Sequence, residues 1–420
     1  MASVTSGNSA PEQLDALPLL AVGMPVREGL ERVVQAHRGA LVVMSDGEEV
    51  LALCSGGFLL NAEFSPQRLA ELAKMDGAIV LSKDASRIAR ANVHLVPNHS
   101  IPTSETGTRH RTAERVARST SVPVVSVSTA MGVITLYEGT RKHVLRDGRH
   151  LSNQASQVIQ TLARFRQRFD AAVSSLSALE LEDAVTMRDV ALAVQPAELV
   201  CRLAAEVNGY LIELGEDGRL LKLQLDELAA GVEATRDLIV RDYMHMMDKT
   251  DSVGADMQPP AAHHRGHLET DKEKKSGAKQ SVVRLLDGSG APSIGRGSRG
   301  APTHTASDGT WNRALRILQN LDTEELANLD TLTEAIGIQV ESDQVDGSVG
   351  PKGYRLLHRL PNLPEPVIDR IVEHFGSLQA IMRASQKSLE EVEGVGVGRA
   401  TSLRNGLARL AESSILERYE

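Results

Sequence analysis

The first 150 residues alternate between short apolar runs and segments with helical spacing of apolar positions. Apolar runs bounded by Gly, Asn and Asp predict β-strands at residues 40–45, 50–54, 77–82, 92–96, 123–127 and 133–137. Helical spacing predicts helices at residues 14–38, with an interruption at Gly23 and Pro25, at residues 67–75 and at residues 108–119. Strands that alternate with helices indicate an α/β domain with a mixed β-sheet, which we place at residues 14–150.

The pattern changes after residue 150. Val158, Leu162, Phe165 and Phe169 recur at helical spacing, and this pattern continues to residue 247 with a turn at 215–218. These features predict an all-α spine over residues 151–247. Residues 248–310 lose periodicity and are rich in Gly, Ser, Pro and His, which is typical of a disordered linker, and a disordered tail is expected at residues 1–13. Helical spacing resumes over residues 311–420.

Composition limits the class of protein. The chain has 420 residues, of which 41% are hydrophobic and 24% charged, so it can form two or three packed domains. A net charge of −9 argues against a uniformly basic protein that coats nucleic acid. Residues 351–420, however, contain ten Lys or Arg and nine Asp or Glu, so this end is relatively basic and any contact with nucleic acid is expected to be local.

Cysteine content and hydropathy favour a cytoplasmic protein. Cys54 and Cys201 are too few for a disulfide framework or a thiolate metal site. No apolar run reaches the roughly 18 residues of a membrane span, and the N-terminus lacks the pattern of a secretion signal. We therefore expect a protein that is neither exported nor bound to a membrane.

An acidic residue precedes a glycine where the predicted strand 77–82 begins. Glycine allows a ligand to approach the backbone closely, and Asp76 beside Gly77 and Ala78 could hold a divalent metal or orient a hydroxyl group. The alternative is an ordinary Asp-Gly turn before a strand, and this tripeptide alone favours that alternative.

Basic residues occupy the start of the predicted helix 108–119. Arg109 and Arg111 flank His110 in its first turn, where acidic residues are normally favoured because of the helix dipole. Free N–H groups and guanidinium groups at a helix start are suited to bind a polyphosphate. The alternative is a solvated basic helix start. The chain contains no Walker A motif, zinc-binding spacing or GxSxG motif.

A glycine-rich hairpin lies between two predicted helices near the C-terminus. Gly394, Gly396 and Gly398 precede Arg399, so the next helix begins with accessible backbone N–H groups that suit a phosphate of a nucleic-acid backbone. A weaker counterpart, with prolines in place of glycines, lies at residues 360–366. The alternative is a helix-turn-helix element that serves packing only.

Together these motifs resemble one family, the DNA-integrity scanning proteins (DisA), which are diadenylate cyclases. The resemblance depends on Asp76-Gly77-Ala78 and Arg109-His110-Arg111 within their extended sequence strings, and it covers the chain except the tail and the linker. It implies a cyclase domain, a helical spine and a helix-hairpin-helix DNA-binding domain, the last at about residues 351–412. It also implies a homo-octamer in which cyclase domains face one another.

The resemblance implies condensation of two ATP molecules into cyclic di-AMP and two pyrophosphates, with Mg²⁺ or Mn²⁺ as the metal. It implies that branched DNA or recombination intermediates bind the C-terminal domain and lower synthesis, as a DNA-integrity checkpoint in a nucleoid-associated protein. It assigns catalysis to Asp76, Arg109, His110 and Arg111, and the metal to Asp76. ATP binding is assigned to the same four residues and to Gly77, Ala78, Leu95, Thr108, Thr112 and Ser128, and DNA binding to Gly394, Gly396, Gly398 and Arg399.

Two departures from the family pattern are present. Many relatives carry arginines directly after the serine that Ser128 matches, whereas this chain has Thr129, Ala130 and Met131, which puts triphosphate contacts from this loop in doubt. The insertion at 248–310 also lies outside the usual pattern. Two other functions remain open, a non-catalytic DNA-binding scaffold that senses ATP and an accessory protein of a nuclease or helicase, although Asp76 and both arginines favour catalysis.

Overall fold

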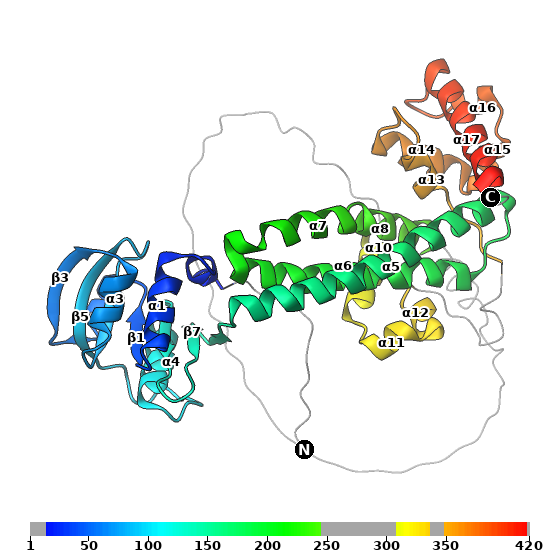
Figure 1. Cartoon of the computed structure of the whole chain (residues 1–420). Helices are drawn as coiled ribbons and strands as arrows, with labels where there is room; N and C mark the ends of the chain where they lie inside the picture. Colours follow the sequence, from blue (N-terminus) through cyan, green and yellow to red (C-terminus); the bar gives the residue numbers. More distant parts are fainter. Residues whose placement is uncertain (1–13, 245–307, 337–347, 418–420) are drawn as a thin grey trace, which may run out of the picture.

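A computed structural model describes residues 14–244, 308–336 and 348–417, with side chains omitted at 308–310 and 413–417. Figure 1 shows an α/β domain at one end, a bundle of long helices in the middle and a small helical domain at the other end. The predicted α/β, all-α, all-α order is confirmed. The predicted tail at 1–13 and most of the predicted linker at 248–310 lie outside the described residues.

The α/β domain contains a mixed sheet of eight strands. Seven follow the order β2-β5-β4-β1-β6-β7-β8, and β3 also pairs with β5. Strands β1 and β4 are parallel, and the other neighbours are antiparallel. The strands are β1 (Ala40–Val43), β2 (Cys54–Ser55), β3 (Phe58–Glu63), β4 (Ala78–Leu81), β5 (Arg87–Leu95), β6 (Val124–Val127), β7 (Ile134–Glu138) and β8 (Arg141–Val144).

Helices cover both faces of this sheet. Helices α1 (Pro25–Gln35) and α3 (Pro66–Leu72), with the short η1 (Leu17–Leu20), pack on one face, and α2 (Glu48–Leu51) and α4 (Thr108–Thr120) pack on the other. The central strands β1, β4 and β6 are therefore buried along their whole length. This explains why they appear in the sequence as continuous apolar runs.

The sequence prediction was wrong at one strand and incomplete at three others. The strand predicted at 50–54 is instead the end of α2 followed by the two-residue β2, because Glu48 and Glu49 occupy the first turn of a helix and only Val50 is buried. Strand β5 begins at Arg87 rather than at residue 92. Strands β3 and β8 were not predicted, since their residues are mostly exposed or alternate without a strong apolar run.

Four helices form the spine predicted at 151–247. They are α5 (Gly148–Glu182), α6 (Met187–Leu214), α7 (Arg219–Ala229) and α8 (Val232–Tyr243), with the short η2 (Gly215–Gly218) at the predicted turn. Leu162 and Phe169 are buried in the spine core, and Val158 and Phe165 pack against it. Thr186 and Asp189 cap α6 reciprocally, which fixes where the second long helix begins.

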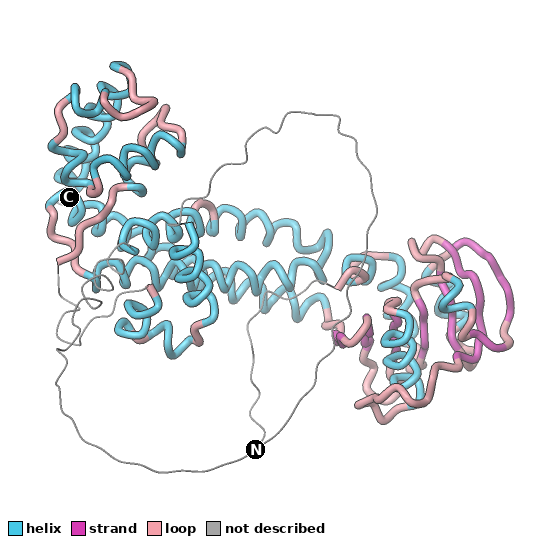
Figure 2. Tube along the Cα trace, turned by 180° about the vertical axis from the view of Figure 1, so that it is seen from behind, coloured by secondary structure: helices cyan, strands magenta, loops and turns pink. Residues whose placement is uncertain are grey.

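A second segment of the chain completes this core. Helices α10 (Asp308–Asn320), α11 (Thr323–Ala327) and α12 (Leu329–Ala335) contribute buried leucines to the same hydrophobic cluster. Gln195 Nε2 donates to the Leu326 carbonyl at 2.8 Å, and Arg202 Nη2 to the Leu318 carbonyl at 2.7 Å. Helix α10 begins two residues before the predicted end of the linker at residue 310. Figure 2 shows these helices beside the long helices of the spine.

The C-terminal domain consists of α13 (Tyr354–His358), α14 (Glu365–Phe375), α15 (Leu378–Arg383), α16 (Gln386–Glu390) and α17 (Val397–Glu417). Buried side chains join it to the spine. Asp242, at the end of α8, accepts the backbone N–H groups of Gly353, Tyr354 and Arg355 at 2.9, 2.6 and 2.9 Å. Arg355 donates to Ser177 Oγ at 2.9 Å and to Glu180 Oε2 at 2.5 Å.

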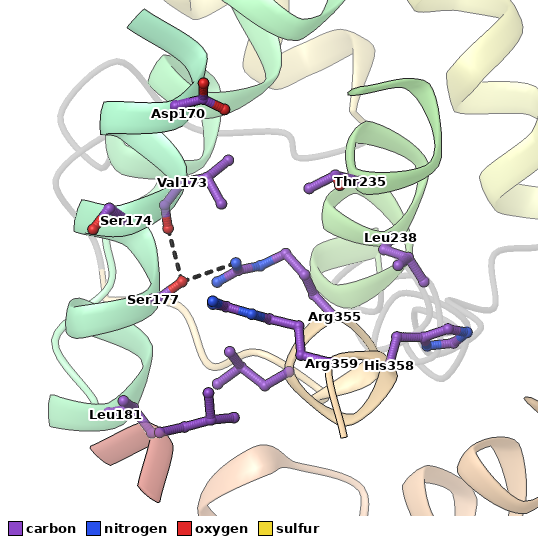
Figure 3. A pocket seen from close by; sticks show the side chains of 12 residues that line it. Asp170, Val173, Ser174, Ser177, Leu181, Thr235, Leu238, Arg355, His358 and Arg359 are labelled. Atoms are coloured by element: carbon purple, nitrogen blue, oxygen red, sulfur yellow. Dashed lines mark hydrogen bonds between the residues drawn. The ribbon is translucent and has the colours of Figure 1, made fainter. Parts of the chain in front are cut away.

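A cavity of about 450 Å³ lies at this junction, between α5, α8, α13 and α17. Figure 3 shows Arg355 and Arg359 extending from the α13 side toward α5, and the bond from Arg355 to Ser177. The junction therefore combines a buried ion pair with a partly open space. Among the described helices, none is long and apolar enough to cross a membrane.

Candidate active site and nucleic-acid interface

The predicted cyclase residues meet at one edge of the sheet. Leu41 pairs with Ala78, so the starts of the parallel strands β1 and β4 lie side by side, and Asp76 lies just before β4. Ala40 pairs with Val127, which places Ser128 beside the start of β1. The antiparallel β5 ends at the same edge, at Leu95.

The backbone around Gly77 explains the glycine in structural terms. Gly77 has φ = +100°, and a Cβ atom there would lie 2.9 Å from the backbone carbon of Asn92. The Asn92 side chain also donates from Nδ2 to the Asp76 carbonyl at 2.5 Å. Any larger residue would therefore be strained and would collide with β5. A close approach by a ligand, the role predicted for Gly77, stays a prediction.

Asp76 presents an exposed carboxylate at this edge. Its side chain is 100% exposed, and the nearest cation is Arg109, with 3.6 Å between Nη2 and Oδ1. Its carboxylate oxygens are therefore accessible to a hydroxyl group or a metal. The described residues contain no group of three or more His, Cys, Asp or Glu side chains that could hold a metal ion.

Helix α4 points its first turn toward the same edge. Gly107 is the N-cap residue, and no side chain caps the helix, so its first N–H groups remain accessible. The two arginines differ. The Arg109 side chain is 41% exposed and packs against the backbone at Gly39. A Cβ added at Gly39 would lie 2.6 Å from Arg109 Nη1. Arg111, in contrast, is exposed. Thr108 is exposed and Thr112 is half-buried.

His110 is half-buried between these arginines and bonds into the sheet. Its Nδ1 lies 2.9 Å from the Tyr137 hydroxyl, and its Nε2 is buried without a hydrogen-bond partner in the described part of the chain. Burial lowers the pKa of His110 below its ordinary value. Tyr137 was not among the predicted site residues, because a tyrosine inside a buried strand looks like a core residue.

A buried acid on α4 fixes the loop that leads into the helix. Glu114 accepts hydrogen bonds from the Thr103 hydroxyl, the Ser104 backbone N–H and Arg118. Arg115 donates to the Ile101 carbonyl at 3.0 Å. The start of α4 is therefore held in place before any ligand binds. Glu114 was not among the predicted site residues, since nothing in the local pattern distinguishes it from a surface residue.

The remaining predicted ATP-binding residues have different surroundings. Ala78 and Leu95 have side chains buried in the core beneath α4, so they can offer only backbone atoms to a ligand. Ser128 begins the turn between β6 and β7, and its Oγ accepts the Met131 N–H at 3.3 Å. Thr129 and Met131 are exposed in this turn, and Thr129 Oγ1 lies near Arg109 at Gly39.

The C-terminal glycine hairpin joins α16 to α17. Val392 and Val395 are buried in the domain core, while Gly394, Gly396 and Gly398 are exposed. No atom lies within 4 Å of a Cβ built on Gly396 or Gly398, so the tip is open. Arg399 is exposed and donates to the Gly394 carbonyl at 2.7 Å, so it also stabilises the hairpin.

The chain is similar to known proteins over most of its length. Residues 27–142 match the family model for the DisA bacterial checkpoint controller nucleotide-binding region, and residues 145–269 match that for its linker region. The chain is 46% identical over 415 residues to a DNA integrity scanning protein DisA from Acidothermus cellulolyticus and covers 97% of it. The identity to a protein of the same name from Kineococcus radiotolerans is 44% over 403 residues, 96% of each chain. A solved structure of DacA from Staphylococcus aureus matches 31% of the chain and 91% of DacA with 21% identity and a TM-score of 0.25.

Proposed function

Because the chain belongs to the DisA family of diadenylate cyclases, we propose that it condenses two ATP molecules into cyclic di-AMP and two pyrophosphates. The observation that supports this best is the exposed Asp76 carboxylate beside Arg109 at an uncapped helix start. An acid that can orient a hydroxyl group lies next to cations that can bind phosphates, which are the two functions that nucleotidyl transfer needs.

Two copies of the chain are needed for one reaction. The 3′-oxygen of each nucleotide attacks the α-phosphorus of the other, two phosphodiester bonds form, and two pyrophosphates leave. Each chain has one Asp76 and one Arg109–Arg111 segment, so two sheet edges must face each other. We propose a homo-octamer built on this contact. Asp76 orients the attacking hydroxyl, and Arg109 and Arg111 neutralise the negative charge of the leaving pyrophosphate.

The residues at this edge fit Mg²⁺ or Mn²⁺ only if substrate phosphates and water supply the other ligands. Asp76 offers one exposed carboxylate, and Mg²⁺ in nucleotide enzymes is commonly held by one or two carboxylates with substrate phosphates and water. Asp76 would hold the metal, and the Ser128 hydroxyl is the next protein oxygen that we propose as a ligand. When bound, the metal would supply charge neutralisation at the phosphates.

A substitution at Asp76 tests the assignment. Asp76→Asn should abolish cyclic di-AMP formation by the purified chain, while binding of ATP in calorimetry persists, because the lost charge acts on the hydroxyl and the metal rather than on the base. Asp46→Asn is the control, since Asp46 is also an acid near an arginine, 3.7 Å from Arg87. Turnover of Asp76→Asn at the wild-type rate would contradict the assignment, and ATP binding without any product in the wild type would favour the scaffold alternative.

We further propose that the C-terminal hairpin binds DNA backbone phosphates and that branched DNA bound there lowers cyclase activity. The open, glycine-lined tip and the exposed Arg399 support contact with phosphates. Such binding would also associate the protein with the nucleoid.

A further inference from the structure

A hydrogen-bonded chain of four side chains runs behind the start of α4. Lys142 on β8 donates to Glu105 Oε1 at 2.5 Å, Glu105 also bonds to the Tyr137 hydroxyl, and this hydroxyl lies 2.9 Å from His110 Nδ1. Tyr137 and Lys142 are direct cross-strand partners, so both side chains leave the sheet on the same face, toward α4. Glu105 lies in the loop that Glu114 fixes, and its N–H donates to Thr103 Oγ1 at 3.1 Å.

The donors and acceptors among these four side chains allow one arrangement of protons. The Lys142 ammonium can only donate, and an ionised Glu105 can only accept. Burial disfavours the charge on Glu105, but the hydrogen bonds from Lys142 and Tyr137 outweigh it and lower the pKa of this carboxyl. The single hydroxyl proton of Tyr137 is therefore donated to Glu105. The Tyr137 oxygen must then accept, so His110 carries its proton on Nδ1.

This arrangement leaves the other ring nitrogen, Nε2, without a proton at the helix start. His110 Nε2 is buried and has no hydrogen-bond partner in the described residues. The adjacent Cδ2 lies 3.6 Å from a Cβ built on Gly107, the N-cap residue, so this edge of the ring borders the uncapped N–H groups of α4. The ring therefore presents an unprotonated nitrogen where the proposed phosphate site needs donors.

The charges that face the ring explain why it is neutral without a ligand. Burial lowers the pKa of His110, the Glu105 charge opposes this effect, and the charges of Lys142 and Arg109 add to it. Lys142 on β8 thus acts against Glu105 on the pKa of this ring. Tyr137 on β7 lies between them and stays un-ionised, because burial and the Glu105 carboxylate raise its pKa. A bound polyphosphate would add negative charge beside the ring and so raise the pKa of His110.

We propose that Tyr137, Glu105 and Lys142 are positioning residues that hold His110 ready to take up one proton at Nε2 when a nucleotide triphosphate binds. The inference rests on the proposed function and deepens it. The proton comes from solvent, Nε2–H then donates to a phosphate oxygen, and Nδ1–H keeps its bond to Tyr137. The Glu105 carboxylate, behind the tyrosine, stabilises the imidazolium. No bond in the nucleotide forms or breaks in this step.

Calorimetric titration with 3′-deoxy-ATP and Mg²⁺ tests the proposal on the full chain. This analogue lacks the attacking hydroxyl, so only binding is measured. Titrations near neutral pH in two buffers with different ionisation enthalpies give the number of protons taken up. The wild type should take up a proton at a substantial fraction of sites, and His110→Gln should take up none.

Glu105→Gln is the decisive variant. It keeps the size of the side chain but removes its charge, and its amide can donate to Tyr137 and so release the hydroxyl proton toward His110. Proton uptake should disappear and affinity should fall about tenfold. Glu71→Gln is the matched control, because Glu71 is also paired with a lysine, at 2.6 Å, but lies exposed on α3. Its proton uptake should equal that of the wild type.

The outcomes separate this inference from the proposed function. If 3′-deoxy-ATP binds the wild type without proton uptake, or if Glu105→Gln takes up as many protons as the wild type, the inference is overturned and the cyclase assignment stands. If the analogue does not bind the wild type at all, the proposed function fails together with the inference.

Discussion

At the scale of single residues, the two arginines of α4 have unequal surroundings. Arg109 is held against Gly39 and lies 3.6 Å from Asp76, whereas Arg111 is exposed and has no ion pair within the described ranges. An ordered side chain loses less entropy when it binds a phosphate than a free one does. Arg109 is therefore expected to contribute more to nucleotide affinity than Arg111.

Alanine substitutions measure this difference. Arg109→Ala and Arg111→Ala should each weaken binding of 3′-deoxy-ATP by about 1.5–3 kcal/mol, with Arg109→Ala at the upper end. Arg68→Ala on α3 is a control, because Arg68 is exposed and its guanidinium donates to the Glu63 carbonyl. Wild-type affinity in both α4 variants would show that the segment is merely a solvated basic helix start.

The sequence predicted those residues whose chemistry is local. Asp76 next to Gly77, and arginines in the wrong place for the helix dipole, are visible in a few neighbouring positions. Glu105, Tyr137 and Lys142 come from a loop and two strands, and their contact depends on the register of β7 and β8. A single sequence does not contain that register, so the hydrogen bonds that link these three side chains to His110 could not be predicted.

At the scale of elements, burial decided which strands could be predicted. Strands β1, β4 and β6 are covered by helices on both faces and give continuous apolar runs, so each was predicted to within two residues at either end. Strand β3 carries exposed residues at five of six positions and, among the described strands, pairs with β5 alone. Its sequence therefore lacks the alternation that a half-buried strand normally shows.

The short helix α13 depends on a carboxylate from another part of the chain. Asp242 is 1% exposed and accepts three backbone N–H groups at the start of α13. Asp242→Ala leaves these donors buried without partners and should destabilise the junction by about 3–5 kcal/mol. Hydrogen exchange of residues 354–375, together with urea unfolding, measures the loss.

A partly exposed pair at the same junction is the control. Asp369 accepts from Arg241 at 2.8 Å and is 33% exposed, so Asp369→Ala should cost about 1 kcal/mol or less. Equal exchange rates and unfolding midpoints for Asp242→Ala and the wild type would contradict the role given to Asp242.

At the scale of the whole molecule, buried acids join the spine to both end domains. Glu213, near the end of α6, accepts from His143 at 3.0 Å and from the Arg146 N–H at 2.5 Å in the α/β domain. Asp242 and Glu180 bind the C-terminal domain at the other end. The 35 residues of α5 span about 50 Å between the two junctions. This rigid connection is a route by which DNA at the hairpin could affect the cyclase.

A charge placed on the hairpin tests this coupling in the intact chain. A four-way DNA junction should inhibit product formation by the wild type but not by Gly396→Glu, whose side chain repels phosphates at the open tip. Gly209→Glu is the control, because Gly209 on α6 also has open space around it and lies outside the C-terminal domain. Equal inhibition of wild type and Gly396→Glu would show that the hairpin is not the sensor.

The central claim is that two nucleotides are joined into one product, and isotope mixing tests it most directly. The purified chain is given Mg²⁺ or Mn²⁺ and an equal mixture of unlabelled and fully ¹³C-adenosine-labelled ATP, and the product is analysed by chromatography and mass spectrometry. The account predicts cyclic di-AMP in unlabelled, half-labelled and fully labelled forms, with the half-labelled form most abundant, and two pyrophosphates released per product. Only ADP, AMP or unchanged ATP would contradict it.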